Sequence, residues 1–238
     1  MEEKSDMLRR LILATSFILL AGCAAVLGPS LKPGIEALAN DDAKTALDYF
    51  EAQIKAGKTS PALYRWGYEA AFRSGNLGRA KDFYNDALAA GFPEDSLNQV
   101  AKKVWYLRAK ELMARDDWKA AINATDVLEQ LDAGSREAAF ARLMIEGYFK
   151  YEKGNHKGLW DALDDFTRAH KHDPDSALPY LMMGRTRIKN DRTNYDAALE
   201  EYALALELEP EGRLAEIIKS EADQIRVTKR KMEAFWGK

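Results

Sequence analysis

One pattern recurs five times along the chain: an alanine is followed, in four of the five copies, by an aromatic residue four positions later. The lead alanines are Ala46, Ala80, Ala121, Ala162 and Ala198, and they lie 34, 41, 41 and 36 residues apart. A self-similar period in this range indicates an array in which every repeat is one supersecondary unit. Such a unit cannot bury its apolar face alone, so the copies must stack against one another.

The spacing within each copy indicates α-helices, because residues four apart lie on one face of a helix. Alanine lets two helices approach closely, and the neighbouring aromatic ring fills the remaining space. The chain of 238 residues contains only 15 glycines and 7 prolines, which favours helices with short turns over a many-stranded sheet. Gly147 and Gly184 lie in the expected first helices of the fourth and fifth copies, and we expect Gly184 to contact the next helix near Ala198.

The last two copies contain the most specific motifs, and both end at a proline. They read NYDAALEEYALALELEP from Asn194 to Pro210 and DALDDFTRAHKHDP from Asp161 to Pro174. Both segments resemble the second helix of the tetratricopeptide repeat (TPR) family, whose period is about 34 residues. The resemblance covers nearly all of the chain after residue 34. It implies an all-α fold, an α-solenoid of stacked TPR-like helix hairpins.

The N-terminal segment resembles the signal of a bacterial lipoprotein. Arg9 and Arg10 precede an apolar run that ends in Leu20-Ala21-Gly22-Cys23. This tetrad resembles a lipobox, which implies that residues 1–22 are a signal peptide and that the Cys23 thiol carries a lipid. Residues 23–34 would then be the lipidated cysteine and a short tether. Cys23 is the only cysteine, so no intramolecular disulfide can form.

Two alternatives for this segment stay open. Residues 11–27 carry no charge, and about 17 residues is the shortest length that spans a bilayer, so an uncleaved signal anchor would hold the same body on the same side. A start at Met7 would remove three acidic residues that precede the arginines. The lipobox implies a membrane-anchored lipoprotein that faces the periplasm. Ala24 stands where aspartate commonly retains lipoproteins in the inner membrane, which favours the outer membrane.

The sequence lacks the motifs of an enzyme. It contains no Gly-rich phosphate loop, paired-histidine zinc motif or nucleophile elbow, so we expect no catalytic residue and no cofactor. His170 and His172 could suggest a metal site. However, residues two apart on a helix point to different faces, so we expect no metal. A formal net charge of -3 gives no reason to expect nucleic acid as a partner.

In TPR proteins the first helix of each hairpin lines a concave groove. The resemblance therefore implies a partner-binding face with basic, acidic and aromatic side chains. Its members would be Arg65, Glu69, Arg73, Tyr106, Lys110, Tyr148, Tyr151, Arg185 and Lys189. Such a face can bind an extended peptide through backbone hydrogen bonds and guanidinium–carboxylate pairs, so we expect a protein or peptide partner, acidic or with a free carboxylate. The alternative is that these are the charges of any solvated face.

The C-terminal region predicts one more amphipathic helix, from Leu214 to Trp236. Its apolar residues would cover the open end of the last repeat, so we divide the body into a solenoid at 35–210 and a capping helix at 211–238. The helix also carries Arg226, Lys229, Arg230 and Lys231. A solvated helix face is the simpler interpretation of this run, and a specific anionic site is the alternative.

Two functions fit these features. The first is a membrane-tethered periplasmic scaffold or adaptor that mediates protein–protein interaction in a cell-envelope complex. The second is a transporter-associated TPR lipoprotein that handles a small-molecule solute. A deep apolar pore through the stack would favour solute handling, whereas a shallow open groove would favour the adaptor.

Overall fold

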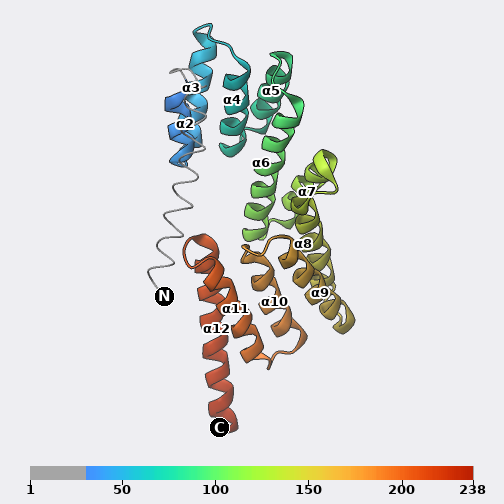
Figure 1. Cartoon of the computed structure of the whole chain (residues 1–238). Coiled ribbons are helices and arrows are strands. Elements are labelled where there is room, and N and C mark those ends of the chain that lie inside the picture. The colour runs from blue at the N-terminus through green and yellow to red at the C-terminus, as the bar shows by residue number, and fades with distance from the viewer. Residues whose placement is uncertain (1–30, 238) are drawn as a thin grey trace, which may run out of the picture. The chain divides into compact units, whose positions relative to one another are not determined.

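A computed structural model of the protein describes residues 31–237, and all regular secondary structure in this range is α-helical (Figure 1). The prediction of an all-α fold is therefore confirmed. The chain divides into two compact units, residues 1–104 and 105–238, and the long helix α6 contains the boundary between them. Residues 1–30, which include Cys23 and its lipobox, lie outside the described part of the chain.

Unit 1 contains two helix hairpins and the first half of α6. Each helix packs on the next one in the chain through α5, so the hairpins form consecutive layers (Figure 1). The helices are α2 (Lys32–Ala39), α3 (Ala43–Lys55), α4 (Pro61–Arg73), α5 (Leu77–Ala89) and α6 (Glu94–Ala114).

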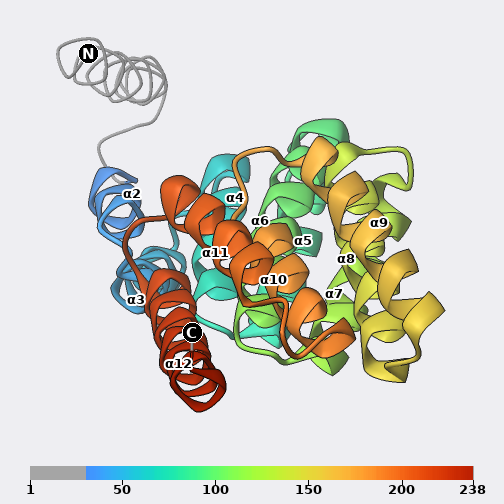
Figure 2. The ribbon, with the colours of Figure 1, turned by 90° about the horizontal axis from the view of Figure 1, so that it is seen from below.

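Unit 2 contains the second half of α6 and six further helices. From α7 onward each helix contacts its successor, and α8 to α12 follow one another in chain order (Figure 2). One continuous apolar core runs through these layers, from Ala109 in α6 to Ala222 in α12. The helices are α7 (Trp118–Asp132), α8 (Arg136–Lys153), α9 (His156–His172), α10 (Leu178–Asn190), α11 (Tyr195–Leu208) and α12 (Arg213–Trp236).

Short polar residues fix where most of the helices begin. In six helices the residue before the first turn accepts a hydrogen bond from a backbone N–H three positions on, which satisfies a donor that has no partner inside the helix. These N-terminal caps are Asp42, Ser60, Asn76, Asp117, Ser135 and Asn155. Because such residues precede six of the eleven described helices, the starts of these six follow from local sequence.

Glycine against an aromatic ring is the recurring contact between the two helices of a hairpin. A Cβ atom on Gly184 would lie 2.3 Å from Cε1 of Tyr202, and one on Gly147 would lie 2.6 Å from Cε1 of Phe166. The same contact joins Gly34 to Phe50 and Gly67 to Phe83. The absence of a Cβ atom therefore sets how closely α2 and α3, α4 and α5, α8 and α9, and α10 and α11 approach.

Three details differ from the sequence-based expectations. Helix α2 begins at Lys32, ahead of the expected solenoid boundary at residue 35, because Pro33 is tolerated in a first turn, where its missing N–H has no helical partner. In the second repeat Phe83, and not Tyr84, fills the space at the glycine. Gly184 contacts α11 at Tyr202, one turn beyond Ala198.

The last helix, α12, packs its first half on α11 through buried Leu214, Ile218 and Ala222. It thus covers the final hairpin, as expected of a capping helix. Between residues 31 and 237, none of the helices is both long and apolar enough to span a membrane.

Candidate binding groove

A groove of about 1020 Å³ lies between α10 and α12, and α11 contributes Tyr195 and Tyr202 to its lining. A second hollow of about 420 Å³ shares three residues with it, Tyr151, Arg185 and Glu221, and reaches the turn between α6 and α7. We call the two together the unit 2 groove. Both parts are open to solvent. Helices α8, α10 and α12, which are the first helices of successive layers, supply most of the lining.

Arg185 lies at the centre of the unit 2 groove, with 16% of its side chain exposed. Its guanidinium donates to Glu221 on α12 at 2.6 Å and to Asp116 in the α6–α7 turn at 2.8 Å. Burial alone would lower the pKa of Arg185, but the hydrogen bonds to these two carboxylates outweigh it and hold the pKa above its ordinary value. Arg185 is therefore a cross-link between three elements of unit 2.

Two tyrosines lie beside Arg185 in the groove, and each contacts a charged side chain. The hydroxyl of Tyr202 donates to Glu221 at 2.8 Å, and burial raises its pKa. Tyr151 lies with its ring 4.0 Å from the Lys189 ammonium, a cation–π contact, and Lys189 is also 3.8 Å from Glu152. These phenols stay protonated at neutral pH and can serve as hydrogen-bond donors or acceptors for a ligand.

At the end of the groove near the α6–α7 turn, two aromatic rings stack face to face. The rings of Trp118 and Tyr148 stack at 4.1 Å with an angle of 8° between their planes. Trp118 is buried, and Tyr148 lines the hollow beside Tyr151. Rigid rings of this kind offer a large contact area at little cost in side-chain entropy.

Two predicted face residues lie elsewhere in unit 2. Tyr106 and Lys110, both on α6, donate hydrogen bonds to one oxygen of Asp173, and the Lys110 bond is 2.8 Å long. Burial raises the pKa of the Asp173 carboxyl, but these two hydrogen bonds outweigh it and the net shift is downward. The cluster joins α6 to the α9–α10 turn, and neither Tyr106 nor Lys110 lines the unit 2 groove.

Unit 1 has its own hollow, of about 560 Å³, between α2, α4 and the first half of α6. Arg65, Glu69 and Arg73 line it together with Trp66. Glu69 is 3.1 Å from Arg65 and 3.8 Å from Arg73, and Arg73 also reaches Asp41 at 2.7 Å. As in unit 2, each predicted cation is matched by a carboxylate of the same unit.

The structure thus distributes the nine predicted face residues over three places. Arg65, Glu69 and Arg73 lie in the unit 1 hollow, and Tyr106 and Lys110 lie at the Asp173 cluster. The four that line the unit 2 groove are Tyr148, Tyr151, Arg185 and Lys189.

Sequence reasoning missed the α12 side of the groove. Ile217, Glu221, Gln224 and Thr228 recur at helical spacing along α12 and line it. This periodicity is visible in the sequence, but a capping helix is not expected to contribute to a groove. At the rim, the side chains of Arg192 and Arg213 are exposed, and within the described range neither side chain has a hydrogen bond or ion pair to another residue.

His170 and His172 each have a partner within unit 2. His170 Nε2 is 3.2 Å from the hydroxyl of Tyr180, and the backbone carbonyl of His172 accepts from Arg136. Among residues 31–237 there is no group of three or more histidine, cysteine or acidic side chains that could hold a metal ion.

No protein-family model and no curated protein matches the chain. Among solved structures, the chain is similar to several TPR proteins. YrrB, described as a TPR protein with an unusual peptide-binding site, is 20% identical, with a TM-score of 0.40 and coverage of 81% of this chain and 91% of that chain. TTC0263, a thermophilic TPR protein from Thermus thermophilus, is 15% identical, with a TM-score of 0.44 and coverage of 83% and 97%.

The chain has an all-α helix-hairpin repeat fold. The contacts that establish it are internal to the chain: consecutive helix packing and the glycine–aromatic contact in four hairpins. At TM-scores below 0.5, the solved structures carry no argument about this chain or its binding site.

Proposed function

We propose that the protein is a membrane-tethered periplasmic adaptor that holds an extended segment of a partner protein in the unit 2 groove. The observation that carries this proposal is the groove itself, which is open to solvent and lined mostly by α8, α10 and α12, the first helices of successive layers. An extended peptide needs a long, accessible surface with hydrogen-bonding groups at intervals, and Tyr151, Gln224 and Thr228 supply such groups.

The openness of the groove favours a protein partner over a small solute. Small-molecule sites bury most of the ligand's surface in an enclosed pocket. The three hollows described above are open to solvent instead, so a free solute bound in one of them would remain largely hydrated. Solute handling in association with a transporter therefore has less support.

The preference for an acidic partner needs revision. It rested on five cations of the predicted face, Arg65, Arg73, Lys110, Arg185 and Lys189. Of the two that line the unit 2 groove, Arg185 already binds two carboxylates and Lys189 lies beside Glu152. Arg192 and Arg213, at the rim, are the cations of the groove that remain available. We therefore propose that most of the contact is aromatic and aliphatic, with one or two carboxylates of the partner at the rim.

The tether and the location are proposed from the lipobox resemblance alone. A lipid on Cys23 would hold the folded body close to the membrane, facing the periplasm. Outer-membrane location is proposed from Ala24.

A photo-crosslinking amino acid on α12 tests the groove. Placed at Gln224, which lines the groove, it should capture a partner protein in intact cells. Placed at Asp223, which is exposed outside the groove on the same helix, it should capture none or a different set. Equal capture from both positions, or capture only from Asp223, would contradict a partner site in the groove.

A further inference from the structure

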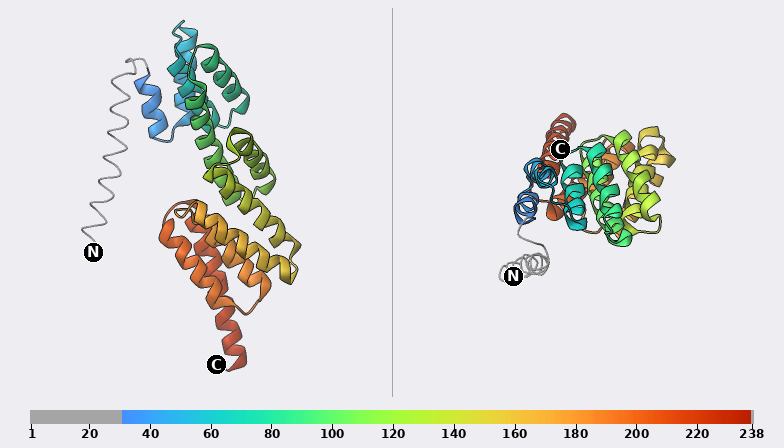
Figure 3. Two further views of the ribbon diagram at one scale, coloured as in Figure 1. Left: turned by 45° about the vertical axis from the view of Figure 1, so that its right-hand side comes forward. Right: turned by 90° about the horizontal axis from the view of Figure 1, so that it is seen from above.

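The last helix of the protein is longer than the helix it covers. At about 1.5 Å per residue, the 24 residues of α12 extend about 36 Å, and the 14 residues of α11 extend about 21 Å. The ion pair between Lys229 and Asp196, at 2.5 Å, joins α12 to the first turn of α11. The residues that follow, Arg230–Trp236, extend beyond α11, and we call them the α12 tip (Figure 3).

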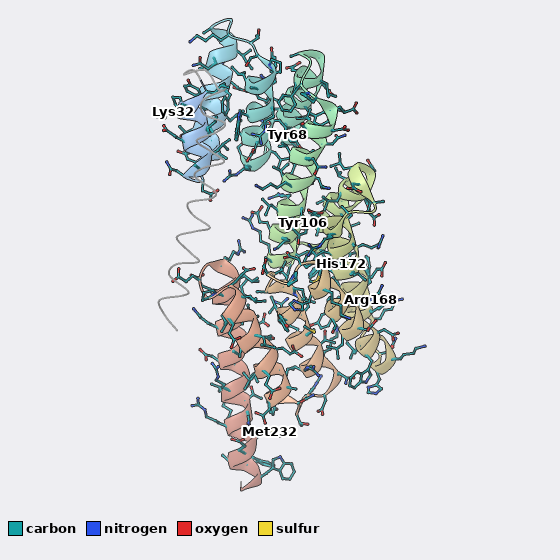
Figure 4. All side chains as sticks on the ribbon, viewed as in Figure 1. Lys32, Tyr68, Tyr106, Arg168, His172 and Met232 are labelled. Atoms are coloured by element: carbon teal, nitrogen blue, oxygen red, sulfur yellow. The ribbon has the colours of Figure 1, made fainter. Side chains whose placement is uncertain are left out.

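The α12 tip continues the apolar stripe of the helix without a helix to cover it. Ile218, Ala222 and Ile225 lie on the α11 side, and Met232 and Trp236 follow at the same helical spacing. Met232 is 36% exposed, Phe235 77% and Trp236 67%. Figure 4 shows Met232 on this projecting end of α12. An apolar stripe that continues past the end of the helix it packs on indicates a surface that contacts something outside the chain.

Basic residues surround these exposed side chains. Between Arg226 and Trp236 the sequence has four cations and one carboxylate, in a chain whose net charge is -3. Arg226 pairs with Asp223, and Lys229 pairs with Asp196 and Glu233. Arg230 and Lys231 are exposed and have no partner among residues 31–237. The tip therefore combines two uncompensated positive charges with a Met, a Phe and a Trp.

We propose that the α12 tip binds the surface of an anionic lipid bilayer. Trp and Phe side chains place themselves at the boundary between headgroups and acyl chains, and Lys or Arg beside them attracts anionic headgroups. The tip presents both kinds of side chain within about two turns of helix, on the part of α12 that extends beyond α11. This contact is independent of the unit 2 groove.

A second copy of the chain fits the α12 tip less well. A stable dimer buries roughly 800 Å² on each partner, which three side chains at a helix end do not provide. Pairing two tips would also bring Arg230 and Lys231 close to their own copies, and like charges oppose association. A partner protein would have to enclose a projecting tip in a pocket, whereas a bilayer needs no complementary shape.

The test uses the full chain with a fluorescent reporter at the tip. Cys23→Ser removes the only cysteine, and Ala234→Cys, at an exposed position, then takes an environment-sensitive dye. The protein is added to phosphatidylcholine vesicles with and without phosphatidylglycerol. We expect a blue shift of the emission only with phosphatidylglycerol, suppressed by salt. Arg230→Glu with Lys231→Glu should weaken the apparent affinity at least about tenfold, because it replaces two cations with two anions at the tip.

Matched variants separate the tip from the rest of the molecule. Lys81→Glu with Lys119→Glu makes the same change in net charge at exposed positions on α5 and α7, and should leave the response of the dye unchanged. Phe235→Ser with Trp236→Ser should abolish the response while the helical circular dichroism stays intact. A dye on Lys58→Cys, at the exposed α3–α4 turn, should not respond to phosphatidylglycerol.

Three results would overturn the inference. The first is no difference between the two vesicle types for the dye at residue 234. The second is an equal shift for the dye at residue 58, which would mean general adsorption. The third is a shift that depends on protein concentration without vesicles, which would assign the tip to a second copy of the chain. A failed groove crosslink at Gln224 would leave the expected dye response unchanged.

Discussion

Replacing Gly184 with alanine tests the contact that holds α10 against α11. The new Cβ atom would lie 2.3 Å from Cε1 and 2.6 Å from Cδ1 of Tyr202. The ring has little room to move, because Tyr202 is 2% exposed and its hydroxyl bonds to Glu221. Overpacking costs about 1–3 kcal/mol. The better helix propensity of alanine offsets up to about 1 kcal/mol, so we expect unit 2 to lose about 1–2 kcal/mol of stability.

Urea unfolding followed by circular dichroism measures this loss, and hydrogen exchange at the amides of α10 and α11 locates it, because helical arrays open in parts. The matched control is Gly78→Ala, where the nearest atom to the new Cβ is Asn76 Oδ1 at 4.0 Å and only helix propensity acts. A double variant with Tyr202→Leu should recover part of the loss through coupling between the two sites. If Gly184→Ala and Gly78→Ala have the same effect, the close contact with Tyr202 is refuted.

Three further outcomes are expected. Cys23→Ser should abolish labelling by a fatty-acid analogue, and persistent labelling would refute the lipobox interpretation. Arg185→Ala should destabilise unit 2 by about 2–3 kcal/mol in urea, because it leaves Glu221 and Asp116 without their shared donor; unchanged stability would show that the cross-link is dispensable. The pKa of Asp173 is lower in the folded state than in the unfolded state, so ionised Asp173 stabilises the fold. This stabilisation is present above the pKa of the unfolded state, near 3.8, and it is lost as the pH falls through the pKa of the folded state. Asp173→Asn should therefore flatten the loss of stability on acidification, which denaturation at a series of pH values measures.

Local sequence was sufficient to predict the hairpins. The lead alanines Ala46, Ala121, Ala162 and Ala198 are fully buried, and Ala80 is 2% exposed. Their burial follows from helical periodicity, and polar caps fix the helix starts within the chain itself. These are short-range properties, so the all-α hairpin fold could be predicted from the sequence alone.

The ion pairs could not be predicted in the same way. Arg185 and Asp116 are far apart in the sequence, and their contact depends on how α10 stacks beside the α6–α7 turn. In the second repeat Phe83 packs on Gly67, whereas Tyr84 donates a hydrogen bond to Asn98 on α6, a contact between helices that local sequence does not reveal. The lengths of α11 and α12 could be predicted from the sequence. That the α12 tip extends beyond α11 could not, because it depends on how α12 packs beside α11.

The pairing of charges also changes how the groove must be tested. Reversing Arg185 to glutamate would place a third carboxylate beside Glu221 and Asp116, and the helices would separate whether or not a partner binds there. Arg192 and Arg213 are exposed, so Arg192→Glu with Arg213→Glu should leave the helical signal and the urea midpoint unchanged. If a partner carboxylate binds at the rim, this variant should reduce crosslinking from Gln224 and remove most of its salt dependence. Undiminished capture would show that the aromatic and aliphatic lining alone holds the partner, and the proposed rim contacts would be refuted.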